Sequence, residues 1–169
     1  MRGRRMLVRA GLGLTASAAT VLFATIGTAS ASVEVTKLTQ AQAASQLSAA
    51  GVTHSSSGNC TDRNNPTCTS YEQINQSTVD GVITLKRAGG CAVNITGGTE
   101  TGHASGTYSH WNGYKVDTAH NSCLDGYIKN NFTYIGLRGD GYPQWQAASG
   151  NLYADEGNHW DITYYTCGC

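Results

Sequence analysis

Residues 97–117 read GGTETGHASGTYSHWNGYKVD, and this stretch decides how the chain is organised. It is rich in glycine, histidine and small hydroxyl residues, which is typical of an irregular loop. Asn112 and Gly113 favour a turn, and the residues at 114–117 predict a short strand that ends in Asp117. The segment 91–96 predicts another strand. The sequence therefore predicts a long polar loop held between two strands.

Two histidines and one aspartate are candidate ligands for a metal ion. In a straight strand His110 and Asp117 would lie roughly 23 Å apart, so the chain must turn back between them before one ion can bind both. His159, in the segment DEGNHW at 155–160, is the third candidate. Three protein ligands leave one position open for water, which is the arrangement of catalytic zinc. Glu156 lies three residues before His159, where a chain turn would bring it alongside the metal, and is a candidate general base.

These two motifs resemble those of the zinc D-Ala-D-Ala carboxypeptidase family, which belongs with lysostaphin-type peptidases and Hedgehog N-terminal domains. The family pattern is Ser-x-His-x-x-Gly-x-Ala-x-Asp followed by Glu-x-x-His-Trp, and the resemblance covers about residues 70–165. It implies one zinc ion held by His110, Asp117 and His159, with Glu156 as general base. It also implies cleavage of bacterial peptidoglycan peptides, and a small antiparallel sheet with helices packed on one side.

We assign three further residues, Glu100, Ser109 and Trp160, to substrate binding. Ser109 directly precedes His110, one position later than the family serine. Glu100 ends the segment TGGTE at 96–100, where the family carries Ser-Gly-Tyr-Arg. An acidic residue there would repel a terminal carboxylate, which favours an endopeptidase over a carboxypeptidase. We expect Trp160 to form a wall that keeps water out of the site.

His103 lies in the glycine-rich loop, seven residues before His110. It is a candidate oxyanion stabiliser, and a surface histidine is the alternative. His54 and His120 lie in polar, turn-forming sequence and are assigned no role.

The first 31 residues predict a cleaved secretory signal peptide. Four arginines precede an apolar segment at 10–28, and Ala-Ser-Ala at 29–31 is a typical cleavage site. A membrane anchor and a twin-arginine signal are the alternatives. Without these residues, seven Lys/Arg stand against eleven Asp/Glu, a net charge of about −4. This charge argues against a nucleic-acid partner and against an anionic membrane, and we expect a secreted monomer.

Six cysteines follow the predicted signal peptide, at positions 60, 68, 91, 123, 167 and 169. An even number in an exported chain favours disulfides, and the spacing does not suit a thiolate metal site. We predict a Cys60–Cys68 bridge and two bridges that link Cys91 and Cys123 with the C-terminal pair.

The remaining pattern predicts an α+β fold in one domain of about 138 residues. Residues 32–68 are expected to form an N-terminal helix over 39–50, capped by Thr39, and a disulfide-tied loop. Residues 69–169 are expected to form the peptidase-like domain. Further helices are predicted at 69–87 and 122–131, and strands at 133–137, 142–147, 151–154 and 160–166, with a hairpin turn at 138–142.

Two other classes of protein are alternatives to an enzyme. One is a cell-wall or protein-binding domain that keeps the zinc site without turnover, and the other is a disulfide-stapled inhibitor or toxin. The presence of Glu156 favours the enzyme, because a binding protein does not need a general base.

Overall fold

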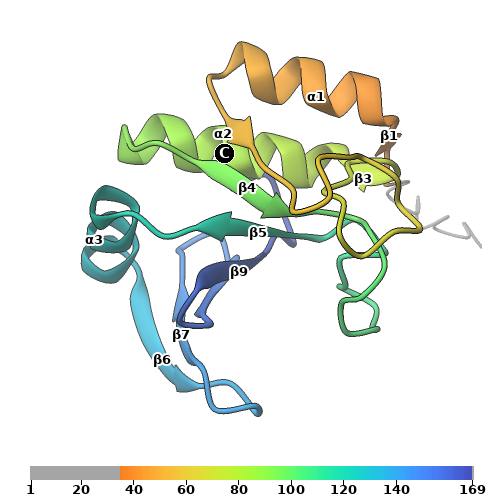
Figure 1. Ribbon diagram of the computed structural model, residues 1–169. Coiled ribbons are helices and arrows are strands. Elements are labelled where there is room, and N and C mark those ends of the chain that lie inside the picture. The colour runs from red at the N-terminus through yellow and green to blue at the C-terminus, as the bar shows by residue number, and fades with distance from the viewer. Residues whose placement is uncertain (1–34, 169) are drawn as a thin grey trace, which may run out of the picture. The chain divides into compact units, whose positions relative to one another are not determined.

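The computed structural model describes residues 35–168, and the predicted signal peptide lies outside them. Twelve elements follow one another along this part of the chain (Figure 1): β1 (Lys37–Leu38), α1 (Gln40–Ala49), β2 (Thr53–His54), β3 (Ile74–Asn75), α2 (Gln76–Gly89), β4 (Asn94–Gly97), β5 (Lys115–Ala119), α3 (Ser122–Asn131), β6 (Thr133–Leu137), β7 (Pro143–Gln146), β8 (Leu152–Asp155) and β9 (His159–Thr163). None of these helices is long and apolar enough to cross a bilayer.

Seven strands form the main sheet in the order β2-β4-β5-β9-β8-β7-β6, and β1 and β3 form a separate pair. The predicted α+β class is confirmed, but the sheet is larger than predicted and is not purely antiparallel. β2 runs parallel to β4, whereas the other neighbours are antiparallel. Parallel strands need a long crossover connection, and the segment containing α2 supplies it.

The two faces of the sheet have different surroundings. Successive side chains in a strand point to opposite faces, so Val116 of β5 and Ile162 of β9 share one face with Trp160. These residues are buried in one apolar core with side chains of α2 and α3. Figure 1 shows α1 lying beyond α2, and these two helices contact each other. Asp117 and His159 point to the opposite face.

Residues 35–68 pair and pack with the rest of the described fold. β1 pairs with β3, β2 extends the main sheet beside β4, and α1 contacts α2. The predicted Thr39 cap of α1 is present and forms a capping box with Gln42, and Gly51, with φ 75°, follows the helix.

Helix α2 begins later than the sequence predicts. Gln73 has φ 65° and Ile74–Asn75 forms β3, so the helix predicted from residue 69 begins only at Gln76. The Ser70 N–H donates to a carboxylate oxygen of Glu100, and the Ser70 carbonyl accepts from the Thr99 N–H. Tertiary pairing thus overrides the local helical pattern. At its other end α2 is terminated by Gly90, which has φ 64°.

The structure contains the predicted Cys60–Cys68 disulfide, which closes the loop before β3. The other prediction is wrong: Cys91 and Cys123 pair with each other and not with the C-terminal cysteines. Cys91 follows the end of α2 and Cys123 lies in the first turn of α3. These two helices contact each other, so the sulfurs are close although 32 positions separate them.

Candidate metal centre

Asp117 lies at the centre of the candidate site, on the sheet face opposite the core. It is only 7 % exposed, and its Oδ1 atom has no hydrogen-bond partner among the described residues. Gly97 of β4 makes room for it, because a Cβ atom at that position would lie 2.4 Å from Asp117 Oδ2. A buried carboxylate oxygen without a donor is costly unless a cation or water satisfies it.

His110 and His159 reach this same oxygen from two distant segments. The turn predicted at 112–113 forms, with the Gly113 N–H donating to the His110 carbonyl at 2.7 Å. It places His110 Nε2 3.3 Å from Asp117 Oδ1. His159 begins β9, the strand beside β5, and its Nε2 lies 3.5 Å from Asp117 Oδ1. Both predicted histidines therefore lie near Asp117, but the histidine that completes a compact group with His110 and Asp117 is His103, which the sequence did not predict as a ligand.

The second nitrogen of each ring is bound to an oxygen. His110 Nδ1 lies 2.7 Å from the Gly98 carbonyl, and His159 Nδ1 lies 2.6 Å from Asn158 Oδ1. A carbonyl oxygen only accepts hydrogen bonds, so both Nδ1 atoms carry the proton. In the neutral rings the lone pairs are then on Nε2, facing Asp117. This orientation by an outer oxygen is typical of metal-binding histidines.

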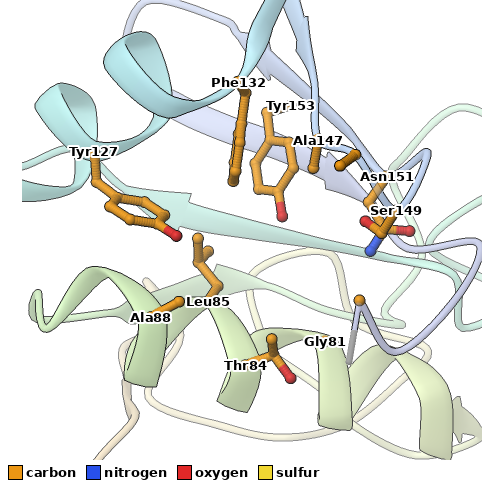
Figure 2. A pocket seen from close by; sticks show the side chains of 12 residues that line it. Gly81, Thr84, Leu85, Ala88, Tyr127, Phe132, Ala147, Ser149, Asn151 and Tyr153 are labelled. Carbon is orange, nitrogen blue, oxygen red and sulfur yellow. The ribbon is translucent and has the colours of Figure 1, made fainter.

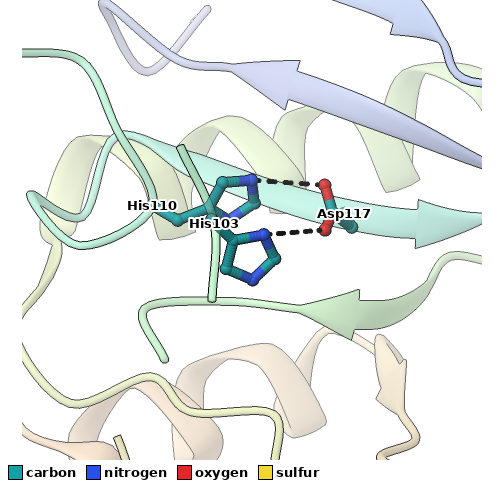
Figure 3. A group of neighbouring side chains, drawn as sticks. All are labelled: His103, His110 and Asp117. Carbon is teal, nitrogen blue, oxygen red and sulfur yellow. Dashed lines mark ion pairs between the residues drawn. The ribbon is translucent and has the colours of Figure 1, made fainter. Parts of the chain in front are cut away.

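His103 is the third histidine of the site. Its ring stacks on that of His110, with centroids 3.8 Å apart, and its Nδ1 lies 3.7 Å from Asp117 Oδ2 (Figure 3). Its Nε2 lies 3.0 Å from Glu100 Oε1. Ligand atoms of His103, His110 and Asp117 all lie within 4.8 Å of one another, so this His/His/Asp group could hold a metal ion.

Glu156 lies beside these histidines, in the turn between β8 and β9. Its Oε2 is 3.3 Å from His159 Nε2, and its Oε1 accepts a hydrogen bond from Arg138. Gly157, with φ 82°, allows the tight turn that returns the chain to His159. One carboxylate oxygen is therefore fixed, and the other faces the candidate metal centre.

Four charged residues of the site were missed by the sequence reasoning: Lys115, Arg138, Asp140 and Asp161. Asp161 is the direct cross-strand partner of Asp117. Its position two residues after His159 on a strand was the available signal, because alternate residues share a face. Arg138 belongs to the predicted hairpin turn between β6 and β7, to which we gave no role. It donates to Asp161, Asp140 and Glu156.

The three residues assigned to substrate binding lie elsewhere. Trp160 points into the core, where its Nε1 donates to Asp125 at 2.8 Å, because its neighbour His159 occupies the site face. Ser109 Oγ accepts the Asn112 N–H and stabilises the turn. None of the three is among the residues that line the cavity described below.

Glu100 is a buried structural carboxylate. Its Oε2 accepts the N–H groups of Ser70 and Gly98 at 2.7 and 3.0 Å. Burial raises its pKa, but hydrogen bonds from His103, Ser70 and Gly98 lower it further, and the net pKa lies below its usual value. The predicted repulsion between Glu100 and a substrate carboxylate therefore has no structural basis.

Electrostatics couple His110 and Asp117 strongly. Burial lowers the pKa of His110, but the carboxylates of Asp117 and Asp161 raise it, and the net pKa lies above its usual value. Burial raises the pKa of Asp117, whereas His110, His159 and His103 lower it, and the net pKa is depressed. The carboxylate and the adjacent imidazole therefore each favour the charged form of the other.

These residues line an open cavity of about 520 Å³. An adjoining cavity of about 320 Å³ shares Lys115, Arg138 and Asp161 with it and adds Tyr108 and Tyr165, whose rings lie 4.8 Å apart edge to face. The uncovered sheet face thus carries a continuous groove.

A separate cavity of about 190 Å³ lies between α2, α3 and the β7–β8 turn (Figure 2). Leu85, Tyr127, Phe132 and Tyr153 contribute to its walls. The described residues that line it include no histidine, carboxylate or basic side chain. Of these two cavities among the described residues, only the groove on the other face is lined by histidines and charged side chains.

When the chain is compared with protein-family models, curated proteins and solved structures, none of them matches it.

Proposed function

We propose that the protein is an exported zinc peptidase that hydrolyses peptide bonds of bacterial peptidoglycan, in stem peptides or cross-bridges. One observation carries the proposal. His110 and His159, which come from segments almost fifty residues apart, direct Nε2 atoms to the same unpartnered oxygen of Asp117, and the free oxygen of Glu156 lies beside them. Two histidines, one carboxylate ligand and a separate base form a donor set that suits catalytic zinc.

The residues present fit a divalent cation. Asp117 offers a buried oxygen without a donor, and both imidazoles have their Nδ1 atoms bound to oxygens. The two disulfides are typical of an exported protein. A bound zinc ion would supply Lewis-acid chemistry, by activating water and polarising a peptide carbonyl.

Glu156 is the group that moves the proton. Its Oε2 accepts a proton from the attacking water and then donates it to the leaving amine. Arg138 holds Oε1 and so fixes the direction of the carboxylate. A binding domain without turnover does not require this arrangement, so the position of Glu156 favours an enzyme.

The groove suits an extended peptide. On one side of the Lys115–Asp161–Arg138 cluster lie the histidines, and on the other lie Tyr108 and Tyr165. Glu100 does not line the groove, so it provides no argument against a terminal carboxylate in the substrate. The products then decide between carboxypeptidase and endopeptidase action.

The test uses the exported chain, loaded with zinc, on purified peptidoglycan, with the products identified by mass spectrometry. We expect shortened stem peptides or opened cross-bridges, loss of activity on chelation, and recovery on adding zinc. His110→Ala should abolish cleavage, while Asp80→Asn, on α2 and hydrogen-bonded to Gln76, should leave it unchanged. Equal cleavage by the chelated and the zinc-loaded protein would contradict the proposal.

A further inference from the structure

The turn that carries Glu156 is bound to helix α3 at both of its ends. Asp155 is the last residue of β8 and Trp160 lies near the start of β9, and the register of the two strands pairs these residues. Their side chains therefore share the face of the sheet that α3 helps to cover. Trp160 Nε1 donates to Asp125 Oδ1 at 2.8 Å, and Lys129 Nζ lies 2.9 Å from Asp155 Oδ2.

His120 joins these two attachments. It follows β5, and its Nδ1 lies 2.8 Å from Asp125 Oδ1. Its Nε2 is buried and lies 3.3 Å from Asp155 Oδ1, without an aligned hydrogen bond to any described residue. The ring also packs against Trp160, with the centroids 5.3 Å apart. One imidazole thus connects α3 with the residue that directly precedes Glu156.

The charges of this cluster balance when the His120 ring carries a proton. The other charged groups are the carboxylates of Asp125 and Asp155 and the ammonium group of Lys129. An ionised carboxylate only accepts hydrogen bonds and a neutral imidazole has one N–H, so only the protonated ring presents an N–H to both carboxylates. Burial raises the pKa of Asp155, but Lys129, the Gly157 N–H and His120 lower it, and the net pKa lies below its usual value. Asp155 is therefore an ionised partner at neutral pH.

Asp155 also shapes the turn itself. Its Oδ1 accepts the Gly157 N–H at 3.0 Å, and the Glu156 N–H donates to the His159 carbonyl at 3.0 Å. A general base must lie within hydrogen-bond reach of the water that it deprotonates, and a displacement of about 1 Å can cost about a hundredfold in rate. A movement of Asp155 would therefore displace the carboxylate of Glu156 by enough to slow the reaction.

We infer that His120 is a positioning residue for Glu156 and acts through Asp155. The inference rests on the proposed function, in which Glu156 is the general base. His120 is not among the described residues that line the groove. It acts from the helix-covered face of the sheet, and so gives a role to a histidine for which the sequence pattern suggested none.

The experiment compares His120→Ala with the wild type by hydrogen exchange of backbone amides and by kinetics on soluble peptidoglycan fragments at equal zinc content. We expect the amides of Glu156 and Gly157 to exchange at least about tenfold faster in the variant. We expect kcat to fall at least about tenfold, with KM within about threefold of the wild-type value. Added to Glu156→Gln, His120→Ala should change kcat by less than about twofold, because a residue that acts through Glu156 has no effect once the base is lost.

His54→Ala is the matched control. The ring of His54 contacts Tyr71 edge to face, and its strand β2 is adjacent to neither β8 nor β9. We expect wild-type exchange at the turn and wild-type kcat. Lys129→Gln is a second variant for the case that His120→Ala does not fold: the Lys129 side chain is 44 % exposed, and its replacement removes the cation beside Asp155. It should change exchange and kcat in the same direction.

The outcomes separate the inference from the proposed function. Unchanged exchange at Glu156 and Gly157 in both His120→Ala and Lys129→Gln would overturn the inference, and the proposed function would stand. An equal loss of kcat with and without Glu156 would also overturn it, because His120 would then act by another route. If exchange changes as expected but the wild type cleaves no peptidoglycan, the proposed function fails, while the ordering of the turn by His120 is confirmed.

Discussion

At the scale of single residues, the stability of the site depends on which positive charges compensate its buried carboxylates. Asp117 is buried with one oxygen unpartnered, and His110 lies 3.3 Å from it. Removing such a carboxylate from water is costly, so a cation must compensate. Either a metal ion or a proton on His110 can supply that positive charge.

This competition between proton and metal predicts a pH dependence. The pKa of His110 is raised by folding, so its stabilising contribution is complete below about pH 6.5 and is lost as the pH rises through the folded value. The pKa of Asp117 is depressed, so its contribution is lost only as the pH falls below about 4. The metal-free protein should therefore be less stable at pH 8 than at pH 5.5.

Zinc should have the opposite effect, because it binds the neutral ring. We expect the rise in melting temperature on adding zinc to increase from pH 5.5 to pH 8, measured by calorimetry. A rise that is equal at both pH values would show that zinc binds without displacing a proton from the site.

Gly97 provides a second prediction at this scale. A Cβ atom there would lie 2.4 Å from Asp117 Oδ2, closer than non-bonded atoms approach. Gly97→Ala should displace Asp117 and weaken zinc binding, with a loss of about 1–3 kcal/mol in folding stability. Gly139→Ala, in the β6–β7 turn with open space at Cβ, is the control. Unchanged zinc affinity in Gly97→Ala would contradict the placement of Asp117.

Residue types and spacing singled out His110, Asp117, His159 and Glu156, which the structure places near one another, because metal and acid–base chemistry restrict the choice of side chains. The same reasoning failed for Trp160, since strand alternation places it opposite His159. It also missed Arg138, whose contact with Glu156 joins two hairpins that no local pattern connects.

At the scale of elements, α2 links the core to the site. Gly81 lies within this helix because the Tyr164 ring occupies the space beside it: a Cβ atom would lie 2.2 Å from Tyr164 Cδ1. Tyr164 follows β9, the strand that begins with His159. The packing of Tyr164 against α2 therefore helps to fix the position of β9, the strand that carries the candidate ligand His159.

A comparison of two helical glycines tests this packing. Gly81→Ala should lower the free energy of unfolding by about 1–3 kcal/mol, because overpacking exceeds the gain in helix propensity. Gly126→Ala, in α3 with nothing within 4 Å of its Cβ position, should raise it by about 0.5–1 kcal/mol. Urea unfolding measures both. Similar changes in the two variants would contradict the contact with Tyr164.

Elements with strong local signals were predicted well. The predicted ranges 122–131 and 133–137 coincide with α3 and β6, since a cap at Asn121 and a clear change of periodicity mark them. The start of α2 was wrong because Ser70 forms its hydrogen bonds with the loop at 98–100. Hydrogen bonds between residues so far apart in the chain depend on the tertiary structure, and the local sequence does not predict them.

At the scale of the whole described fold, helices cover one face of a seven-stranded sheet and the site occupies the other. The α+β class follows from the order of helical and strand patterns. The number and order of the strands do not, because they depend on long-range pairing. β2, the parallel edge strand, has two residues within a turn-forming segment and therefore has no strand signal of its own.

The Cys91–Cys123 bridge should stabilise this arrangement, because it ties the end of α2 to the start of α3. Replacing both cysteines with alanine should lower the free energy of unfolding by about 2–5 kcal/mol. The shorter loop closed by Cys60–Cys68 should contribute less. Denaturant unfolding of the two double variants gives both values, and an equal or reversed order would contradict this account.

The most direct test of the central claim compares Glu156→Gln with the wild type at equal zinc content. The amide keeps the shape of the side chain but cannot take the proton from water. We predict that both proteins bind zinc and that the variant cleaves peptidoglycan at least about a hundredfold more slowly. Cleavage at the wild-type rate by Glu156→Gln would show that the chemistry does not occur at this site.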